Sequence, residues 1–190
     1  MTSSRPPRAV LVAGMVGMAM ATVVVVVRWS SMELPVEGHP YVQLYDPPSG
    51  RAEAMLVIGD GQAFAALAQD PSLARPGVFR STANAAPPGA EAAYRAQRPV
   101  LGWLGWIAST GRGGAVPAVM LLLTVLASGA LVVVAAELAR RVGRRVDLAP
   151  LVLLAPGAIV VLGGTGVEVL ATALGLAGAL AWTSGRRHAI

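Results

Sequence analysis

Residues 115–138 read AVPAVMLLLTVLASGALVVVAAEL, and this stretch decides the fold class. It holds no charge before Glu137 and exceeds the ~20 residues that a helix needs to cross the ~30 Å hydrocarbon core of a bilayer. The whole chain has the same character, because 55% of its 190 residues are hydrophobic, 13% are charged and the mean hydropathy is +0.62. The sequence therefore predicts an all-α integral membrane protein whose partner is the lipid bilayer.

Apolar runs predict about four transmembrane helices, over residues 9–27, 115–138, 148–162 and 167–183. The first run follows Arg5 and Arg8, as a cleaved signal peptide would, but it is too long and no small-x-small cleavage site follows it. The third is short and contains Pro150 and Pro156, so we expect a kinked, tilted or partly re-entrant segment. We expect residues 163–166 to form the outer turn between the third and fourth helices.

The placement of arginines predicts the orientation of these helices. Eight arginines lie in segments 1–8, 139–147 and 184–190, whereas the seven in the loop 28–114 are matched by seven acidic residues. The positive-inside rule then makes this a multi-pass cell-membrane protein with cytoplasmic termini and an extracytoplasmic loop 28–114. The excess positive charge is explained by the orientation of the spans in the membrane, which argues against nucleic acid as a partner. There is no cysteine and the two histidines are isolated, so we expect neither a metal site nor a cofactor.

The loop 28–114 takes nearly half of the chain, and we expect any functional site in or against it. Residues 60–69 predict a helix, because Phe64, Leu67 and Ala68 share a face before Asp70-Pro71 stops it. Residues 52–58 fit a strand or a helix start, and residues 89–97 a second helix. Two tryptophans among the aliphatic residues of 100–107 are typical of a segment at the level of the lipid headgroups.

Three short motifs follow one another through this loop: Gly59-Asp60-Gly61-Gln62-x-Phe64, Leu67-Ala68-x-Asp70-Pro71 and Ala93-Tyr94-Arg95-x-Gln97-Arg98-Pro99-Val100-Leu101. Their order and placement resemble the first extracytoplasmic loop of bacterial GT-C-type membrane glycosyltransferases and their uncharacterised relatives. The later stretch from Pro156-Gly157 to Gly166-x-Glu168-x-Leu170 resembles the pair of spans that follows in that family.

The resemblance implies transfer of a sugar from a polyprenyl-phosphate carrier to an acceptor on the outer face. It assigns Asp60 as the candidate general base and places Gln62, Tyr94, Arg95, Arg98 and Glu168 in the substrate-binding site. A carboxylate can take the acceptor's proton, and two arginines can hold a phosphate. The alternatives are structural. Asp60 stands where a helix N-cap would, and the arginines can snorkel to headgroups.

Glu168 also leaves two interpretations open. A carboxylate at the start of a membrane span is a functional hypothesis by default, yet it can also cap its own helix at the interface. Members of the family continue for many more spans. We therefore expect a partner membrane protein or missing C-terminal part to complete the enzyme. A four-span protein that has lost the chemistry and an assembly subunit whose outer loop binds another protein are the alternatives.

Overall fold

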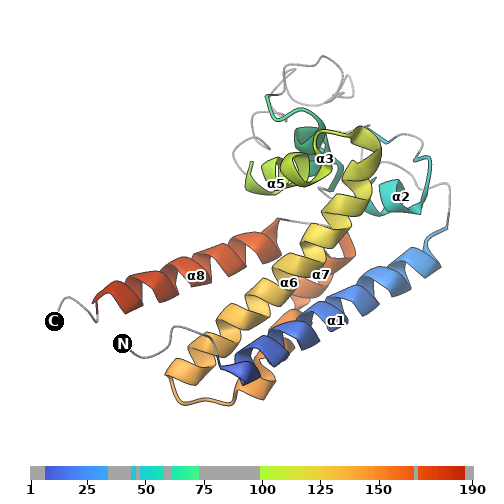
Figure 1. The fold of residues 1–190 in the computed structure, drawn as a ribbon. Coiled ribbons are helices and arrows are strands. Elements are labelled where there is room, and N and C mark those ends of the chain that lie inside the picture. Colours follow the sequence, from blue (N-terminus) through green and yellow to red (C-terminus); the bar gives the residue numbers. More distant parts are fainter. Residues whose placement is uncertain are drawn as a thin grey trace. The chain divides into compact units, whose positions relative to one another are not determined.

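The structure is a computed structural model that describes residues 7–33, 44–45, 48–57, 61–72, 99–164 and 167–186. Its elements, in chain order, are α1 (Arg8–Ser31), α2 (Arg51–Val57), α3 (Gly61–Gln69), α5 (Val100–Ser109), the 3₁₀ helix η1 (Gly113–Ala115), α6 (Val116–Arg141), the 3₁₀ helix η2 (Val146–Leu154), α7 (Pro156–Gly164) and α8 (Glu168–Arg186) (Figure 1). No strand occurs within these ranges, which confirms the all-α prediction.

The chain divides into two compact units. The span unit consists of Met1–Val24, Thr124–Val161 and Glu168–Ile190. The loop unit consists of Val25–Leu123 and Leu162–Val167.

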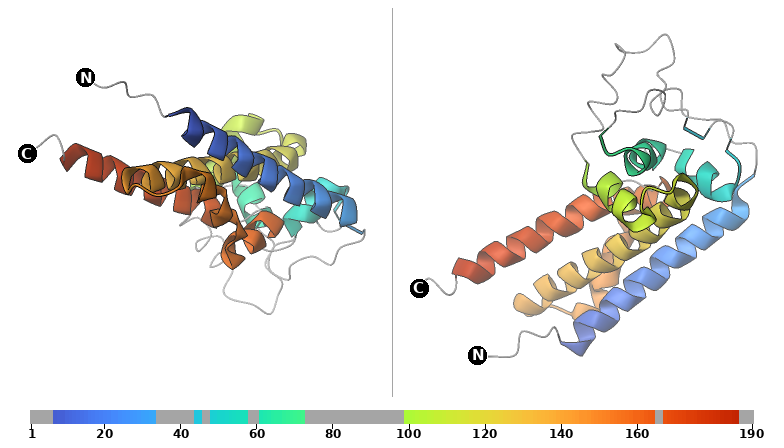
Figure 2. Two further views of the ribbon diagram at one scale, coloured as in Figure 1. Left: turned by 90° about the horizontal axis from the view of Figure 1, so that it is seen from below. Right: turned by 45° about the horizontal axis from the view of Figure 1, so that its top comes forward.

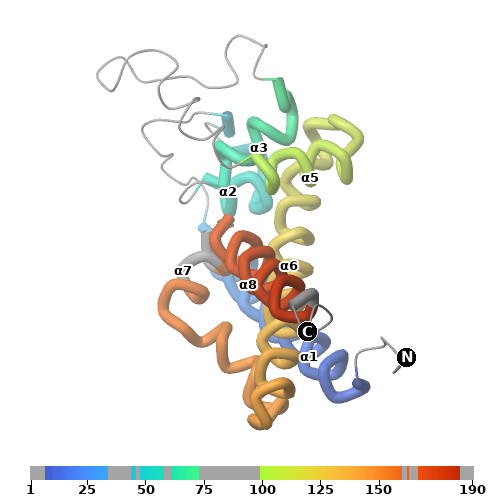
Figure 3. The backbone as a smooth tube through the Cα atoms, turned by 90° about the vertical axis from the view of Figure 1, so that its left-hand side faces the viewer, coloured from blue at the N-terminus to red at the C-terminus, as the bar shows by residue number. Residues whose placement is uncertain are grey.

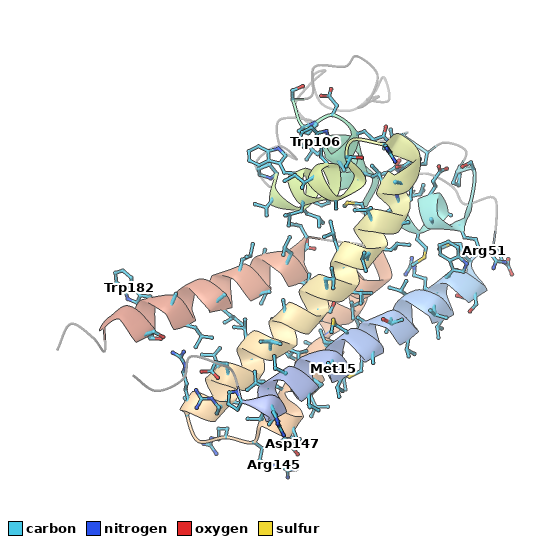
Figure 4. All side chains as sticks on the ribbon, in the orientation of Figure 1. Met15, Arg51, Trp106, Arg145, Asp147 and Trp182 are labelled. Atoms are coloured by element: carbon cyan, nitrogen blue, oxygen red, sulfur yellow. The ribbon has the colours of Figure 1, made fainter. Side chains whose placement is uncertain are left out.

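Two helical stretches are long and apolar enough to cross a membrane, namely α1 with 24 residues and Gly113–Arg141 with 29. Only 28% of the most apolar window of α1 and 44% of that of Gly113–Arg141 is buried, so many large apolar side chains are exposed. Met15, for example, is 64% exposed and is labelled on α1 in Figure 4. Such exposure fits contact with lipid better than contact with water. The structure therefore shows two candidate spans. The apolar part of α8, Glu168–Ser184, is shorter than either of them.

Within the span unit, glycines let α1 and α6 approach closely. A Cβ added at Gly17 would lie 2.6 Å from a methyl carbon of Val132, and one added at Gly14 would collide with Val133. On the facing helix, Gly129 leaves room for Met18 in the same way. Close backbone approach over small residues is a common way for helices to associate in lipid, where there is no hydrophobic drive between them.

The end of α6 is fixed by its backbone and by an ion pair. Gly143 has a φ of +68°, and its N–H donates to the Arg140 carbonyl while that of Arg144 donates to Ala139, which is a Schellman cap. Arg140 and Arg141 both form ion pairs with the Glu137 carboxylate, at 2.7 and 2.8 Å. Arg141 also donates to the Ser184 hydroxyl at 2.8 Å, which joins α6 to α8.

The segment expected as the third span is not one continuous α-helix. The 3₁₀ helix η2 contains Pro150 and ends at Leu154, after which Ala155 adopts an extended conformation and Pro156 begins α7. The physical reason is that proline lacks an N–H and disfavours the helical conformation of the residue before it.

The loop unit is built around α3. Residues Gly61 to Ala68 are all buried, and α3 packs on both α2 and α5, as Figures 2 and 3 also show. A Cβ at Gly105 of α5 would lie 2.8 Å from that of Ala68, so glycine is needed for this contact. The helix predicted over 60–69 is present as α3 from Gly61 to Gln69, and the described part of 52–58, residues 52–57, takes the helical alternative as α2. The helix predicted over 89–97 lies outside the described residues.

Candidate functional site

The six candidate residues differ in what the structure says of them. Asp60, Tyr94, Arg95 and Arg98 lie outside the described residues. Gln62 lies in the first turn of α3 in the loop unit, and Glu168 begins α8 in the span unit.

Gln62 is a buried amide with no visible partner. Gln62 is only 1% exposed. Neither its amide nitrogen nor its amide oxygen makes a hydrogen bond to the described chain. Leaving such a group unpaired costs about 1–3 kcal/mol, and most buried polar groups in folded proteins are paired. Gln62 is therefore the best-supported candidate, because a bound ligand that supplies one donor and one acceptor would remove this cost.

The position of Gln62 on α3 adds a direction to this argument. Helical side chains lean toward the N-terminus of their helix, so Gln62 leans toward the end of α3 where the Gly59-Asp60 part of the motif joins it. A carboxamide can donate to one oxygen and accept from a neighbouring hydroxyl, a pattern that sugar diols and phosphorylated alcohols offer.

Tyr45 is a polar residue of the loop unit that the sequence did not single out. Its hydroxyl accepts a hydrogen bond of 3.2 Å from Gln69 at the far end of α3, and the residue is 8% exposed. Burial raises the pKa of Tyr45 to about 12, the bond from Gln69 opposes that rise, and the charge of Glu53 adds to it. The only sequence signal was its place before the turn residues Asp46-Pro47-Pro48, which predict a turn but no burial.

Glu168 borders a groove in the span unit with a volume of about 600 Å³. Its described lining comes from α6, the η2–α7 junction and the first turns of α8: Leu131, Val152, Ala155, Pro156, Gly157, Ala158, Glu168, Val169 and Thr172. The volume lies within the ~300–1,000 Å³ of typical ligand pockets. Pro156 and Glu168 both stand out in the sequence, but their spacing does not predict that they share a groove.

Within the described residues, no group of three or more His, Cys, Asp or Glu side chains could hold a metal ion. Ion pairs in this part of the chain include the one that Arg145 makes with Asp147, both labelled in Figure 4. The Arg145 guanidinium holds the pKa of the Asp147 carboxyl below its usual value. Both side chains are mostly exposed, which is typical of solvated charge and not of a binding site.

No protein-family model, no curated protein and no solved structure matches this chain.

Proposed function

We propose that the chain is a multi-pass cell-membrane protein that crosses the bilayer four times, with cytoplasmic termini and an extracytoplasmic loop unit. The exposed apolar surfaces of α1 and of Gly113–Arg141 support two of the spans. The apolar stretch Glu168–Ser184 and the balanced charge of the loop 28–114 support the rest of the proposal.

The native chain has no cysteine, so single-cysteine variants test this topology directly. We expect Ser49→Cys to react with a membrane-impermeant maleimide in intact cells. Val142→Cys, at a residue that is 67% exposed, should react only after the cells are opened. Labelling of Val142→Cys in intact cells would overturn the proposed orientation.

We further propose that the protein takes part in transfer of a sugar from a lipid-phosphate carrier on the outer face, alone or with a partner membrane protein that supplies further spans. The observation that carries this proposal is the buried amide of Gln62, which has no hydrogen-bond partner among the described residues and lies two residues after Asp60 in the Gly-Asp-Gly-Gln motif. A buried amide in that place suits hydroxyl groups, which are the polar groups of a sugar.

The proposed step uses the residues in distinct roles. The acceptor oxygen attacks the anomeric carbon, the bond from that carbon to the phosphate oxygen breaks, and the phosphate leaves on its lipid. Asp60 takes the proton of the acceptor hydroxyl, and Arg95 and Arg98 hold the negative charge of the departing phosphate. Gln62 orients a sugar or acceptor hydroxyl, and Tyr94 is proposed to contact the substrate.

Transfer is best measured in native membranes, which retain any partner, with a radiolabelled polyprenyl-phosphate sugar. Asp60→Asn keeps the shape of the side chain but removes the base, so we expect loss of transfer with unchanged membrane insertion. The control is Asp147→Asn, which removes a solvated carboxylate from the other unit and should leave transfer unchanged. Full activity of Asp60→Asn would rule out its assignment as the base.

An assembly subunit is the second candidate function, and the outer face of α5 favours it. The residues of α5 that pack inward are small or polar apart from Leu101, whereas Trp103, Trp106 and Ile107 are 51%, 45% and 63% exposed. A photo-crosslinker at Trp103 that joins one protein in stoichiometric yield would favour this function. Crosslinking to lipid alone would count against it.

A further inference from the structure

The groove beside Glu168 results from the interruption between η2 and α7. Ala155 is extended there, with φ −58° and ψ 137°, and Pro156 cannot continue the hydrogen-bond pattern of η2. A Cβ added at Gly157 would meet nothing within 4 Å, so the groove is open at this point. The interruption therefore leaves a hollow that the described chain does not fill.

The walls of the groove are apolar apart from one edge. Glu168 is the one charged residue in its described lining, and Thr172 lies one turn further along the same face of α8. The rest consists of aliphatic residues, proline and glycine. A ligand that fits this surface has a hydrocarbon part for the walls and a cationic group for the carboxylate.

The lining also distinguishes between cationic groups. Its described part contains no aromatic side chain, whereas quaternary ammonium groups are usually held by aromatic cages. A primary ammonium has three N–H donors that can bond to the Glu168 carboxylate and the Thr172 hydroxyl. An adjacent phosphate is favoured by the N-terminal end of α8, where backbone N–H groups and the helix dipole attract negative charge.

We propose that this groove binds one membrane phospholipid with a primary-amine headgroup, such as phosphatidylethanolamine, with an acyl chain along the apolar walls and the ammonium on Glu168. The span unit offers such a lipid access from the bilayer, because Leu151, Leu154 and Ile159 of η2 and α7 are about half exposed. This site goes beyond the proposed sugar transfer and uses none of the loop residues assigned to it.

The test is lipid retention by the purified full-length protein, measured by native mass spectrometry after exchange into mixed micelles. Each sample contains phosphatidylethanolamine, phosphatidylcholine or phosphatidylglycerol with identical acyl chains. We expect phosphatidylethanolamine to be retained about tenfold more tightly than the other two, which corresponds to one charge-assisted hydrogen bond. Equal retention of phosphatidylcholine would overturn the assignment of a primary amine, and preferred retention of phosphatidylglycerol would overturn the role of Glu168.

Two matched pairs of variants locate the site. Glu168→Gln should abolish the preference among headgroups, whereas Glu33→Gln, which removes an exposed carboxylate from the loop unit, should not. Gly157→Leu should fill the groove and lower retention of all three lipids. Its control is Gly175→Leu, because an added Cβ at Gly175 also meets nothing within 4 Å and Gly175 is not among the residues that line the groove. An unchanged preference in Glu168→Gln, or unchanged retention in Gly157→Leu, would overturn the proposal.

Discussion

α3 and α1 are both helices of small and apolar residues, yet they have opposite surroundings. Every residue of α3 from Gly61 to Ala68 is buried, whereas only 28% of the most apolar window of α1 is buried. Length separates them, because at 1.5 Å per residue the nine residues of α3 span about 14 Å and the 24 of α1 about 36 Å. Apolar composition therefore accompanies a buried core in α3 and a largely exposed apolar surface in α1.

The strongest way to break this comparison is to truncate one large side chain in each helix. Phe64→Ala removes a residue that is 1% exposed, and we expect it to cost about 3–5 kcal/mol through lost burial and a cavity. Met15→Ala, at 64% exposure, should cost far less. Thermal unfolding in detergent, followed by tryptophan fluorescence, measures both. Equal losses of stability would show that α1 is packed like α3.

A charge placed on α1 tests whether its exposed surface faces lipid. Ala19 is exposed near the middle of the helix, and Ala19→Arg should disfavour insertion by about 2.5–3.5 kcal/mol. Gly50→Arg, in the loop unit, is the control, because an added Cβ there meets nothing within 4 Å. The fraction of protein that resists carbonate extraction from membranes reports the difference. If both variants insert normally, α1 is not a span.

Alkaline pH should weaken the loop unit through Tyr45. Because burial raises the pKa of Tyr45 from 10.0 to about 12, folding favours the neutral phenol. The resulting stabilisation is fully present below pH ~10 and is lost as the pH rises toward ~12, by about 2–3 kcal/mol. Tyr45→Phe cannot ionise, so its stability should not fall in this window for that reason. If the stability of the wild type and of Tyr45→Phe fell equally with rising pH, Tyr45 would be excluded as the cause of the loss.

Local patterns predicted the helices well and their surroundings less well. The spacing of Phe64, Leu67 and Ala68 and the stop at Asp70-Pro71 were sufficient to predict α3, and hydropathy was sufficient for α1 and α6. The sequence could not tell which small residues form contacts. Gly129 meets Met18 of α1, whereas an added Cβ at Gly175 or Gly178, which also lie in an apolar helix, meets nothing within 4 Å.

For the candidate residues, too, the sequence predicts the residue but not its surroundings. A motif contains Gln62, but it does not predict that α3 packs against both α2 and α5, two helices that are distant from each other in the sequence. The groove beside Glu168 depends likewise on Leu131 of α6 lying near α8, a contact between segments that local spacing does not encode. The sequence made both polar residues candidates, but their surroundings come from tertiary packing that residue type alone does not predict.

The finest test of the comparison lies within α3 itself, where two glutamines have opposite surroundings. Gln62→Met keeps the length of the side chain and removes a buried amide that has no partner in the described chain, so we expect stability to rise by about 1–2 kcal/mol. Gln69→Met removes the donor to the Tyr45 hydroxyl and should lower stability by about 1 kcal/mol.

Transfer activity and stability should differ in opposite directions between Gln62→Met and Gln69→Met. If Gln62 is kept unpaired for a ligand, Gln62→Met will lose sugar transfer although it is the more stable protein, as expected where a functional site is maintained at a cost in stability. Gln69→Met should keep transfer although it is less stable. Chemical unfolding and the membrane transfer assay, run on the same two proteins, separate these effects. A stabilised Gln62→Met with full activity would leave α3 a purely structural core and remove the main support for the proposed transfer.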